Sequence, residues 1–183
     1  MPMMPFRLLA VCLLLALAAC VGGGPKLSAV FMKPGASVDT LVNAYRRQAG
    51  LNTLSRNASL DAAAGAHARD LASRGALSHK GADGSDHSAR AVRAGYGPFV
   101  VENAAAGQKS VAEVMRGFVR SGEHRRNLEM DPATHYGFAQ AAAPGTKYKN
   151  FYVLVIGRPP PEGDYVVRKA SPGLSLSTLT DIF

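Results

Sequence analysis

The chain has 183 residues, a formal net charge of +8 and only two cysteines. The positive charge favours contact with anionic lipid headgroups or cell-wall polymers. No recognised nucleic-acid-binding motif accompanies the charge, so a nucleic-acid partner is not expected. Because Cys12 and Cys20 both lie near the N-terminus, the folded part is expected to contain no disulfide and to depend on its apolar core.

The N-terminus has the pattern of an export signal. Arg7 precedes an apolar run, Leu8 to Ala19, which is too short to span a bilayer and has the length of a signal h-region. The run ends at Leu17-Ala18-Ala19-Cys20, which resembles a bacterial lipobox. We therefore expect residues 1–19 to be removed as a lipoprotein signal peptide and Cys20 to carry the lipid, for example palmitate. The alternative is a plain secretory signal in which Cys20 is incidental.

The residue after Cys20 bears on where in the cell the protein is located. It is Val21 rather than aspartate, which by analogy with bacterial sorting rules favours the outer membrane of a diderm cell. The glycines and proline that follow predict a flexible tether over residues 20–37. The expected location is therefore the cell envelope, with the domain standing off the membrane.

The domain is expected over residues 38–158 and begins with two helices. Asp39 is a candidate cap for a first helix that runs to about Gln48. A second helix, Ser59–Arg74, is expected to begin at a capping serine and to end at Gly75. A loop rich in glycine and aspartate follows, and then a short helix that ends near Gly95.

In the second half of the domain, the spacing of apolar residues changes from a helical pattern to a strand pattern. The capping box Ser110–Glu113 predicts a helix over Val111–Arg120. Apolar runs then predict strands at Tyr136–Ala142 and Phe151–Ile156, and Val100-Val101 is expected to start or join another strand.

Helices that need an apolar partner, with few strands between them, predict an α+β fold with three layers and a small, mainly antiparallel sheet. Residues 159–183 begin with three prolines that cannot continue a paired strand. We expect a C-terminal extension there, either an extra edge strand or a loosely attached segment.

Three residues from separate segments form the candidate site: His79, Glu102 and His124. Two imidazoles and one carboxylate suit metal capture or acid and base chemistry. The chain contains no Gly-x-Ser-x-Gly elbow, His-Glu-x-x-His motif, EF-hand loop or phosphate-binding glycine motif. A catalytic nucleophile is therefore not identified.

The order of these segments resembles the bacterial branch of the CAP superfamily, which includes cysteine-rich secretory proteins, antigen 5 and pathogenesis-related plant proteins. The resemblance covers residues from about 40 to 158 and rests mainly on Glu102-Asn103 and on the Ser121–Asn127 segment. It implies an α-β-α sandwich and makes His79 the first site histidine. Many members carry a second acid near the end of the preceding helix. Ser121 lies near that position here, and Glu123 either substitutes for the acid or points to water.

Other polar residues are expected to support the site or the fold. Arg90 is expected to pin the loop that carries His79, and Asn103 to donate an amide hydrogen bond that either fixes a backbone turn or orients the cleft. His67 is interpreted as a packed, hydrogen-bonded helix residue and His135 as structural. His87, which follows Asp83 and Asp86 in the same loop region, is a weaker candidate for an auxiliary metal contact.

The leading interpretation is a lipid-anchored envelope protein whose cleft binds Zn²⁺, another divalent cation, or a small and possibly lipidic ligand. His79, Glu102 and His124 would then be the metal ligands, with one position left for water and no organic cofactor. The alternative is a hydrolase of peptides or envelope polymers, with Glu102 or His79 as general base and His124 polarising the carbonyl. A third interpretation is a structural envelope protein whose site residues hold loops together.

Overall fold

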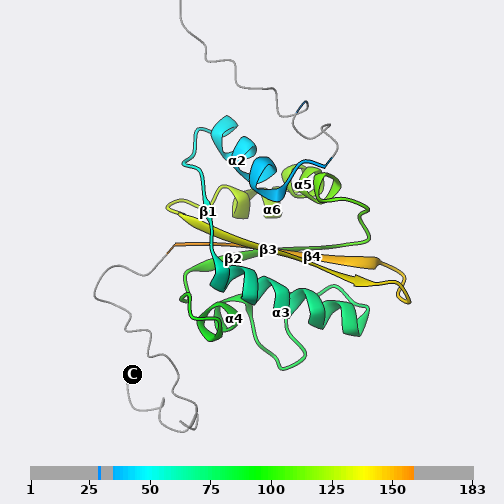
Figure 1. Ribbon diagram of the computed structural model, residues 1–183. Coiled ribbons are helices and arrows are strands. Elements are labelled where there is room, and N and C mark those ends of the chain that lie inside the picture. Colours follow the sequence, from blue (N-terminus) through cyan, green and yellow to red (C-terminus); the bar gives the residue numbers. More distant parts are fainter. Residues whose placement is uncertain (1–28, 30–34, 159–183) are drawn as a thin grey trace, which may run out of the picture.

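The computed structural model describes residue 29 and residues 35–158 (Figure 1). The predicted signal peptide, Cys20 and the C-terminal extension lie outside these residues. The described helices are α2 (Val38–Gln48), α3 (Ala58–Arg74), α4 (His87–Arg93), α5 (Val111–Arg120) and α6 (Gly122–Leu128). The strands are β1 (Ser55–Arg56), β2 (Val100–Ala106), β3 (His135–Ala143) and β4 (Lys149–Gly157). Among the described helices, none has the length and apolarity needed to cross a bilayer.

The strands form one sheet in the order β1-β3-β4-β2. Both β3 and β2 pair with β4 in antiparallel register, and only the two-residue β1 pairs in parallel, with β3. Helices α2, α5 and α6 cover one face of the sheet, and α3 and α4 cover the other (Figure 1). The predicted α+β fold with three layers and a mainly antiparallel sheet is therefore confirmed.

Strand β4 explains why its sequence is a nearly unbroken apolar run. Tyr152, Leu154 and Ile156 enter the core shared with α2 and α5. The intervening residues, Phe151, Val153 and Val155, enter the core shared with α3. Because side chains alternate across a strand, a strand covered on both faces needs apolar residues at every position.

Helix α3 approaches the sheet very closely at one point. A Cβ atom on Gly137 of β3 would lie 2.1 Å from the carbonyl carbon of Leu60 and 2.3 Å from the backbone nitrogen of Asp61. No side chain fits in that space, so glycine is required there. The carboxylate of Asp61 also accepts the N–H of Phe138 at 2.9 Å, which ties the first turn of α3 to β3.

Two of the predicted helix starts are wrong by one or two residues. The first helix is capped by Ser37, whose hydroxyl accepts the N–H of Thr40 at 3.2 Å, whereas Asp39 accepts a hydrogen bond from the hydroxyl of Tyr136. The second helix is capped by Asn57 rather than Ser59, because an asparagine carbonyl can accept two of the free N–H groups at the helix start.

The other boundaries agree better with the sequence. Gly75 ends α3 in the left-handed conformation, with φ of 62°. The Ser110 hydroxyl caps α5 by accepting the N–H of Glu113 at 3.2 Å. Strand β2 continues five residues beyond the predicted Val100-Val101, and β1 and α6 were not predicted as elements.

Candidate functional site

The candidate site is built around the edge strand β2. Glu102 and Asn103 are neighbours in this strand, so their side chains point to opposite faces of the sheet. Glu102 meets residues of the α3 and α4 layer, and Asn103 meets α6 in the other layer. The Glu-Asn pair therefore joins two helical layers at one edge of the sheet.

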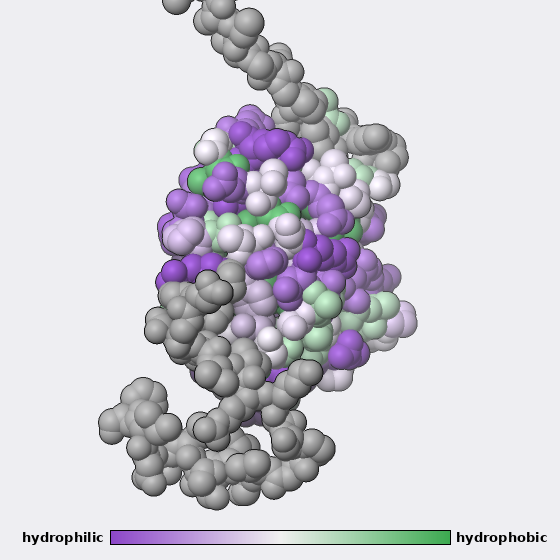
Figure 2. All heavy atoms as spheres, turned by 60° about the vertical axis from the view of Figure 1, so that its left-hand side comes forward, coloured by the Kyte–Doolittle hydropathy of each residue, from purple (hydrophilic) through white to green (hydrophobic). Residues whose placement is uncertain are grey.

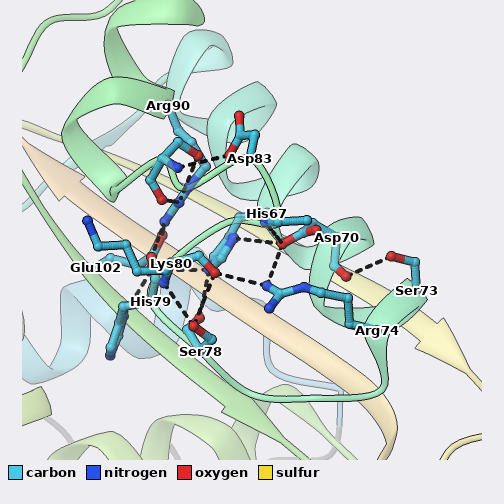
Figure 3. A network of polar contacts seen from close by, with 12 residues as sticks. His67, Asp70, Ser73, Arg74, Ser78, His79, Lys80, Asp83, Arg90 and Glu102 are labelled. Carbon is cyan, nitrogen blue, oxygen red and sulfur yellow. Dashed lines mark hydrogen bonds and ion pairs between the residues drawn. The ribbon is translucent and has the colours of Figure 1, made fainter.

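Glu102 lies at the centre of a buried polar network (Figure 3). Its side chain is 1% exposed, and its two carboxylate oxygens have different partners. Oε1 accepts from His79 Nδ1 at 3.0 Å, and Oε2 accepts from Arg90 Nη2 at 2.7 Å. Burial alone raises the pKa of Glu102, but the hydrogen bonds from His79 and Arg90 outweigh it, so the pKa lies below its usual value. The carboxylate is therefore ionised at neutral pH.

His79 lies in the loop between α3 and α4, as predicted. Because an ionised carboxylate only accepts hydrogen bonds, the Nδ1 atom of His79 carries the proton, and in the neutral ring Nε2 keeps its lone pair. The side chain is 58% exposed, so Nε2 belongs to an accessible ring. The hydrogen bond to Glu102 raises the pKa of His79.

Two arginines hold the loop that carries His79 in place. Arg90 donates to the backbone carbonyls of Ser85 at 2.8 Å and His79 at 3.1 Å, in addition to Glu102. Arg74 donates to the carbonyl of Lys80 at 2.9 Å. Arg90 therefore ties the loop to α4 through two backbone carbonyls.

His124 is supplied by α6 on the other side of β2. Asn103 donates from its amide to the carbonyl of His124 at 2.9 Å, as predicted. Asn127 donates to the carbonyl of Glu102 at 3.1 Å and to the side-chain oxygen of Asn103 at 2.8 Å. The ring of His124 packs on Phe118, with ring centroids 5.1 Å apart. Helix α6 is thus fastened to β2 by amide side chains.

The two histidines have opposite titration behaviour. Burial lowers the pKa of His124, and the charge of His79 lowers it further, so both rings lie in one electrostatic neighbourhood. Glu123, which is exposed in the first turn of α6, acts on both rings and raises the pKa of each, although its effect is the smallest in both cases. Ser121, at the position where relatives often carry an acid, lies between α5 and α6.

The described residues contain no group of three or more His, Cys, Asp or Glu side chains arranged to hold a metal ion. Glu102 has both oxygens occupied by cationic or protonated partners, so its geometry is that of a residue that orients His79. Nε2 of His79 takes no part in the bond to Glu102.

His67 also belongs to the network around Glu102, which was not predicted from the sequence. It is completely buried, and its Nε2 donates to the carbonyl of Ser78 at 2.9 Å, which confirms a packed and hydrogen-bonded role. The same Nε2 also lies 3.5 Å from Glu102 Oε1. A signal was present, since Leu60, His67 and Leu71 share the buried stripe of α3 at helical spacing.

The remaining histidines lie outside this network. His135 of β3 is within hydrogen-bond distance of the Tyr96 hydroxyl at 3.2 Å and the Thr134 hydroxyl at 2.9 Å, which confirms a structural role. His87 is the first residue of α4, and an auxiliary metal contact there stays a prediction.

Solved bacterial structures share this fold. An extracellular protein containing an SCP domain from Bacillus anthracis str. Ames is 24% identical, with a TM-score of 0.57 over 66% of this chain and 38% of that chain. An outer surface protein from Borrelia burgdorferi is 18% identical, with a TM-score of 0.58 over 65% of this chain and 87% of that one. The chain thus spans well under half of the Bacillus protein.

The sequence comparisons identify the family. No curated protein sequence matched the chain. Residues 40–156 match the CAP family, described as the cysteine-rich secretory protein family. This range contains His79, Glu102 and His124 together with most of the described helices and strands, and the chain belongs to the CAP family.

Proposed function

We propose that this protein is a lipid-anchored CAP domain of the cell envelope whose cleft binds a divalent cation such as Zn²⁺ through His79 and His124. The observation that carries this proposal is the hydrogen bond from His79 Nδ1 to buried Glu102, which leaves Nε2 as the ligand atom of an exposed ring. Histidines that bind metals generally donate their other ring N–H to a carboxylate or carbonyl in this way.

The donor set favours a weak and open cation site. Two imidazoles leave further coordination positions for water or for a ligand, whereas tightly held structural zinc has four protein ligands. The charge of Arg90 is neutralised by Glu102 at 2.7 Å, which reduces its repulsion of a cation. Exposed Glu123 is the carboxylate that acts on both rings and is the candidate for a further contact.

Protons compete with the cation at this site, because only neutral imidazole binds a metal. The pKa of His79 is raised above its ordinary value of 6.5 and that of His124 is lowered below it. His124 is therefore already neutral when His79 loses its proton. We expect occupancy to rise with pH through the titration of His79.

The binding test uses untagged protein and calorimetric titration with Zn²⁺ at neutral pH. The His79→Ala, His124→Ala double variant is expected to lose measurable binding, and Glu102→Gln is expected to weaken it about 10- to 100-fold. His135→Gln is the matched control, since it removes an imidazole of β3 outside the cleft, and it should bind like the wild type. Equal affinity in the wild type and the double variant would rule out the proposed site.

The envelope location rests on the N-terminal sequence and on surface charge. The Leu17–Cys20 segment supports a lipid on Cys20 and a place in the outer membrane of a diderm cell. Exposed Lys80, Arg120 and Arg126 favour an anionic envelope polymer or lipid as partner, and hydrophilic residues cover much of the face in Figure 2. The structural relatives from Bacillus and Borrelia are named as extracellular and outer surface proteins, in keeping with this proposal.

Lipidation is tested by replacing each cysteine in turn. Cys20→Ser should abolish labelling with a fatty acid and release the protein from the membrane fraction. Cys12→Ser is the control, because it changes a cysteine within the apolar run and leaves the lipobox intact. Labelling that persists in Cys20→Ser would refute the anchor.

The pair of His79 and Glu102 favours a second candidate, a hydrolase. A carboxylate that orients an imidazole, with the second ring nitrogen free to accept a proton, is also the arrangement of a general base. Peptide or cell-wall polymer hydrolysis that increases through the titration of His79 and disappears in His79→Ala would favour this function. Cation binding without such hydrolysis would favour the binding protein.

A further inference from the structure

Three exposed lysines gather where β3 turns back into β4. Lys147 lies in this turn and Lys149 is the first residue of β4, and the turn extends beyond the helices at one end of the sheet (Figure 1). Lys109 belongs to the loop between β2 and α5. This loop packs alongside the turn, since the side-chain amide of Asn150 donates to the carbonyl of Gln108 at 3.4 Å. We call Lys109, Lys147 and Lys149 the lysine cluster.

The positive charge of the lysine cluster is not neutralised by ion pairs. Among the described residues, no carboxylate lies within ion-pair distance of its three ammonium groups. Glu113, in the first turn of α5, accepts the backbone N–H of Lys109 at 2.8 Å, but it is one acid beside three lysines. By contrast, three arginines of α3 and α4 each contact a carboxylate at 2.6 or 2.7 Å. The cluster therefore presents a positive surface to a partner.

Lys149 has a backbone conformation that is unfavourable for lysine. Its φ is 66°, and within the described part of the chain it is the only residue other than glycine with a positive φ. The N–H of Asn150 donates to the carbonyl of Tyr148 at 2.8 Å, so Lys149 is the central residue of a three-residue turn of the strained kind. Glycine or asparagine would adopt this conformation more easily. A lysine at such a position points to a role for its charge.

The residue type of the cluster indicates what kind of anion it suits. Lysine carries a compact charge on a long, flexible stem, whereas recognition of one fixed anion generally uses the planar fork of arginine. The Lys147 ammonium group lies 4.9 Å from the centre of the Tyr148 ring, which leaves its charge without an acidic partner. Three such groups on one surface suit many mobile phosphates better than a single bound ion.

We propose that the lysine cluster binds the surface of a membrane that contains anionic phospholipids. A negative lipid surface attracts clustered lysines that come within about one Debye length of it. The choice of a membrane as partner rests on the proposed lipid anchor at Cys20. The predicted tether, residues 20–37, would have an average end-to-end distance of about 20 to 25 Å, which keeps the domain close to the lipid surface.

The test measures how the full-length protein with Cys20→Ser sediments with vesicles. One set of vesicles contains phosphatidylcholine alone, and the other also contains phosphatidylglycerol. The ratio of the two partition coefficients isolates the electrostatic contribution, because apolar segments contribute to both. The protein should prefer the phosphatidylglycerol vesicles at low salt and lose this preference at about 1 M salt, where the Debye length is about 3 Å. Since the lipid is absent, failure of the proposed anchor would leave this result unchanged.

Substitutions assign the preference to the lysine cluster. Lys147→Gln and Lys149→Gln should each lower the partition ratio about fivefold. Lys149→Arg keeps the charge and should bind like the parent protein. Arg47→Gln is the control, because it removes an exposed positive charge at the end of α2. The neighbouring Arg46 donates to the carbonyls of Leu128 and Met130, which precede β3, so the control lies towards the opposite end of that strand.

Lys149→Asn separates the charge from the backbone conformation. Asparagine tolerates a positive φ, so the melting temperature should stay the same or rise, while the partition ratio falls about fivefold. A lysine with a structural role alone would give the opposite result, a lower melting temperature with an unchanged ratio.

Two further results would overturn the proposal. An unchanged partition ratio in the Lys147→Gln, Lys149→Gln double variant would place the contact with lipid elsewhere. An equal fall in Arg47→Gln would mean that net charge alone, and not this cluster, decides binding.

Discussion

The two helical layers of this domain are packed by different means. The layer of α3 and α4 meets the sheet through small residues, such as Ala64, Ala68 and Ala91, and through the close approach at Gly137. The layer of α2, α5 and α6 meets the sheet through large side chains, including Tyr45, Met115, Phe118, Tyr136 and Tyr152. The buried polar groups also differ: Glu102 pairs with Arg90 on the α3 and α4 side, whereas Arg46 and Asn103 donate to backbone carbonyls on the other side.

Each histidine of the cleft reflects the layer it comes from. His79 is oriented by ionised Glu102 and holds its proton more strongly than a free histidine does. His124 packs on Phe118, is partly buried, and holds its proton less strongly. The pKa of one histidine is thus controlled mainly by a charged hydrogen-bond partner and that of the other mainly by burial.

The close approach of α3 is the feature whose loss should cost most. Gly137→Ala places a methyl group 2.1 Å from the backbone of Leu60, and α3 must move away from the sheet. We expect the free energy of unfolding to fall by about 3 kcal/mol or more. Urea unfolding of Gly137→Ala measures it, and Gly145→Ala is the control, since nothing lies within 4 Å of an added Cβ there. Equal stability of the two variants would mean that α3 does not pack this closely against β3.

A substitution in the charge network around Glu102 should have the next largest effect on stability. Glu102→Gln removes the partner of buried Arg90, and leaving one member of a buried pair uncompensated costs about 3 kcal/mol. The pKa of His79 should fall towards its ordinary value, because its main cause is removed. Urea unfolding and an NMR titration of His79 measure the two effects. Exposed Glu123→Gln is the control, and a similar loss of stability there would refute a special role for Glu102.

The aromatic layer is tested by Phe118→Leu. This change keeps a large apolar residue in the core and removes the ring that contacts His124, so we expect a loss of about 1 kcal/mol. Phe99→Leu, at a partly exposed phenylalanine, is the control and should cost less. A titration of His79 that stays unchanged in Phe118→Leu would support separate control of the two rings. A change at His79 as large as at His124 would contradict it.

The smallest effect is the order in which the histidines titrate in the wild type. His79 should titrate above pH 6.5 and His124 below it. Protonated His79 therefore contributes stability that is present below pH 6.5 and is lost as pH rises through its folded pKa. For His124 the sign is reversed, and stability is lost as pH falls below 6.5. Histidine NMR resonances measure both, and the opposite order would show that the two layers do not differ in this way.

Elements with a strong local pattern were predictable from the sequence. The apolar run of β4, the cap at Ser110 and the glycine after α3 each act within a few residues, and the structure has them where expected. Helix α6 was not predicted, because its sequence is mostly polar and its only buried residue is Leu128. Strand β1 has two exposed residues and depends on pairing with distant β3.

The sequence indicated candidate site residues but not the contacts that they make. Arg90 and Asn103 make the supporting bonds that were expected. The sequence indicated Glu102 as a candidate. It did not indicate that both carboxylate oxygens are hydrogen-bonded, because the donors, Arg90 and His79, come from other segments. The contact of His67 with Glu102 joins residues that are far apart in the chain, and no local pattern reports such a contact.

Strand β2 has a consequence for the order in which the protein assembles. Its register with β4 pairs residues 100–106 with residues 151–157, and this register decides which face receives Glu102 and which receives Asn103. A slip by one residue would exchange the two faces and separate both histidines from their supports. The supports of both histidines therefore depend on a long-range pairing, which requires the chain to be complete through β4.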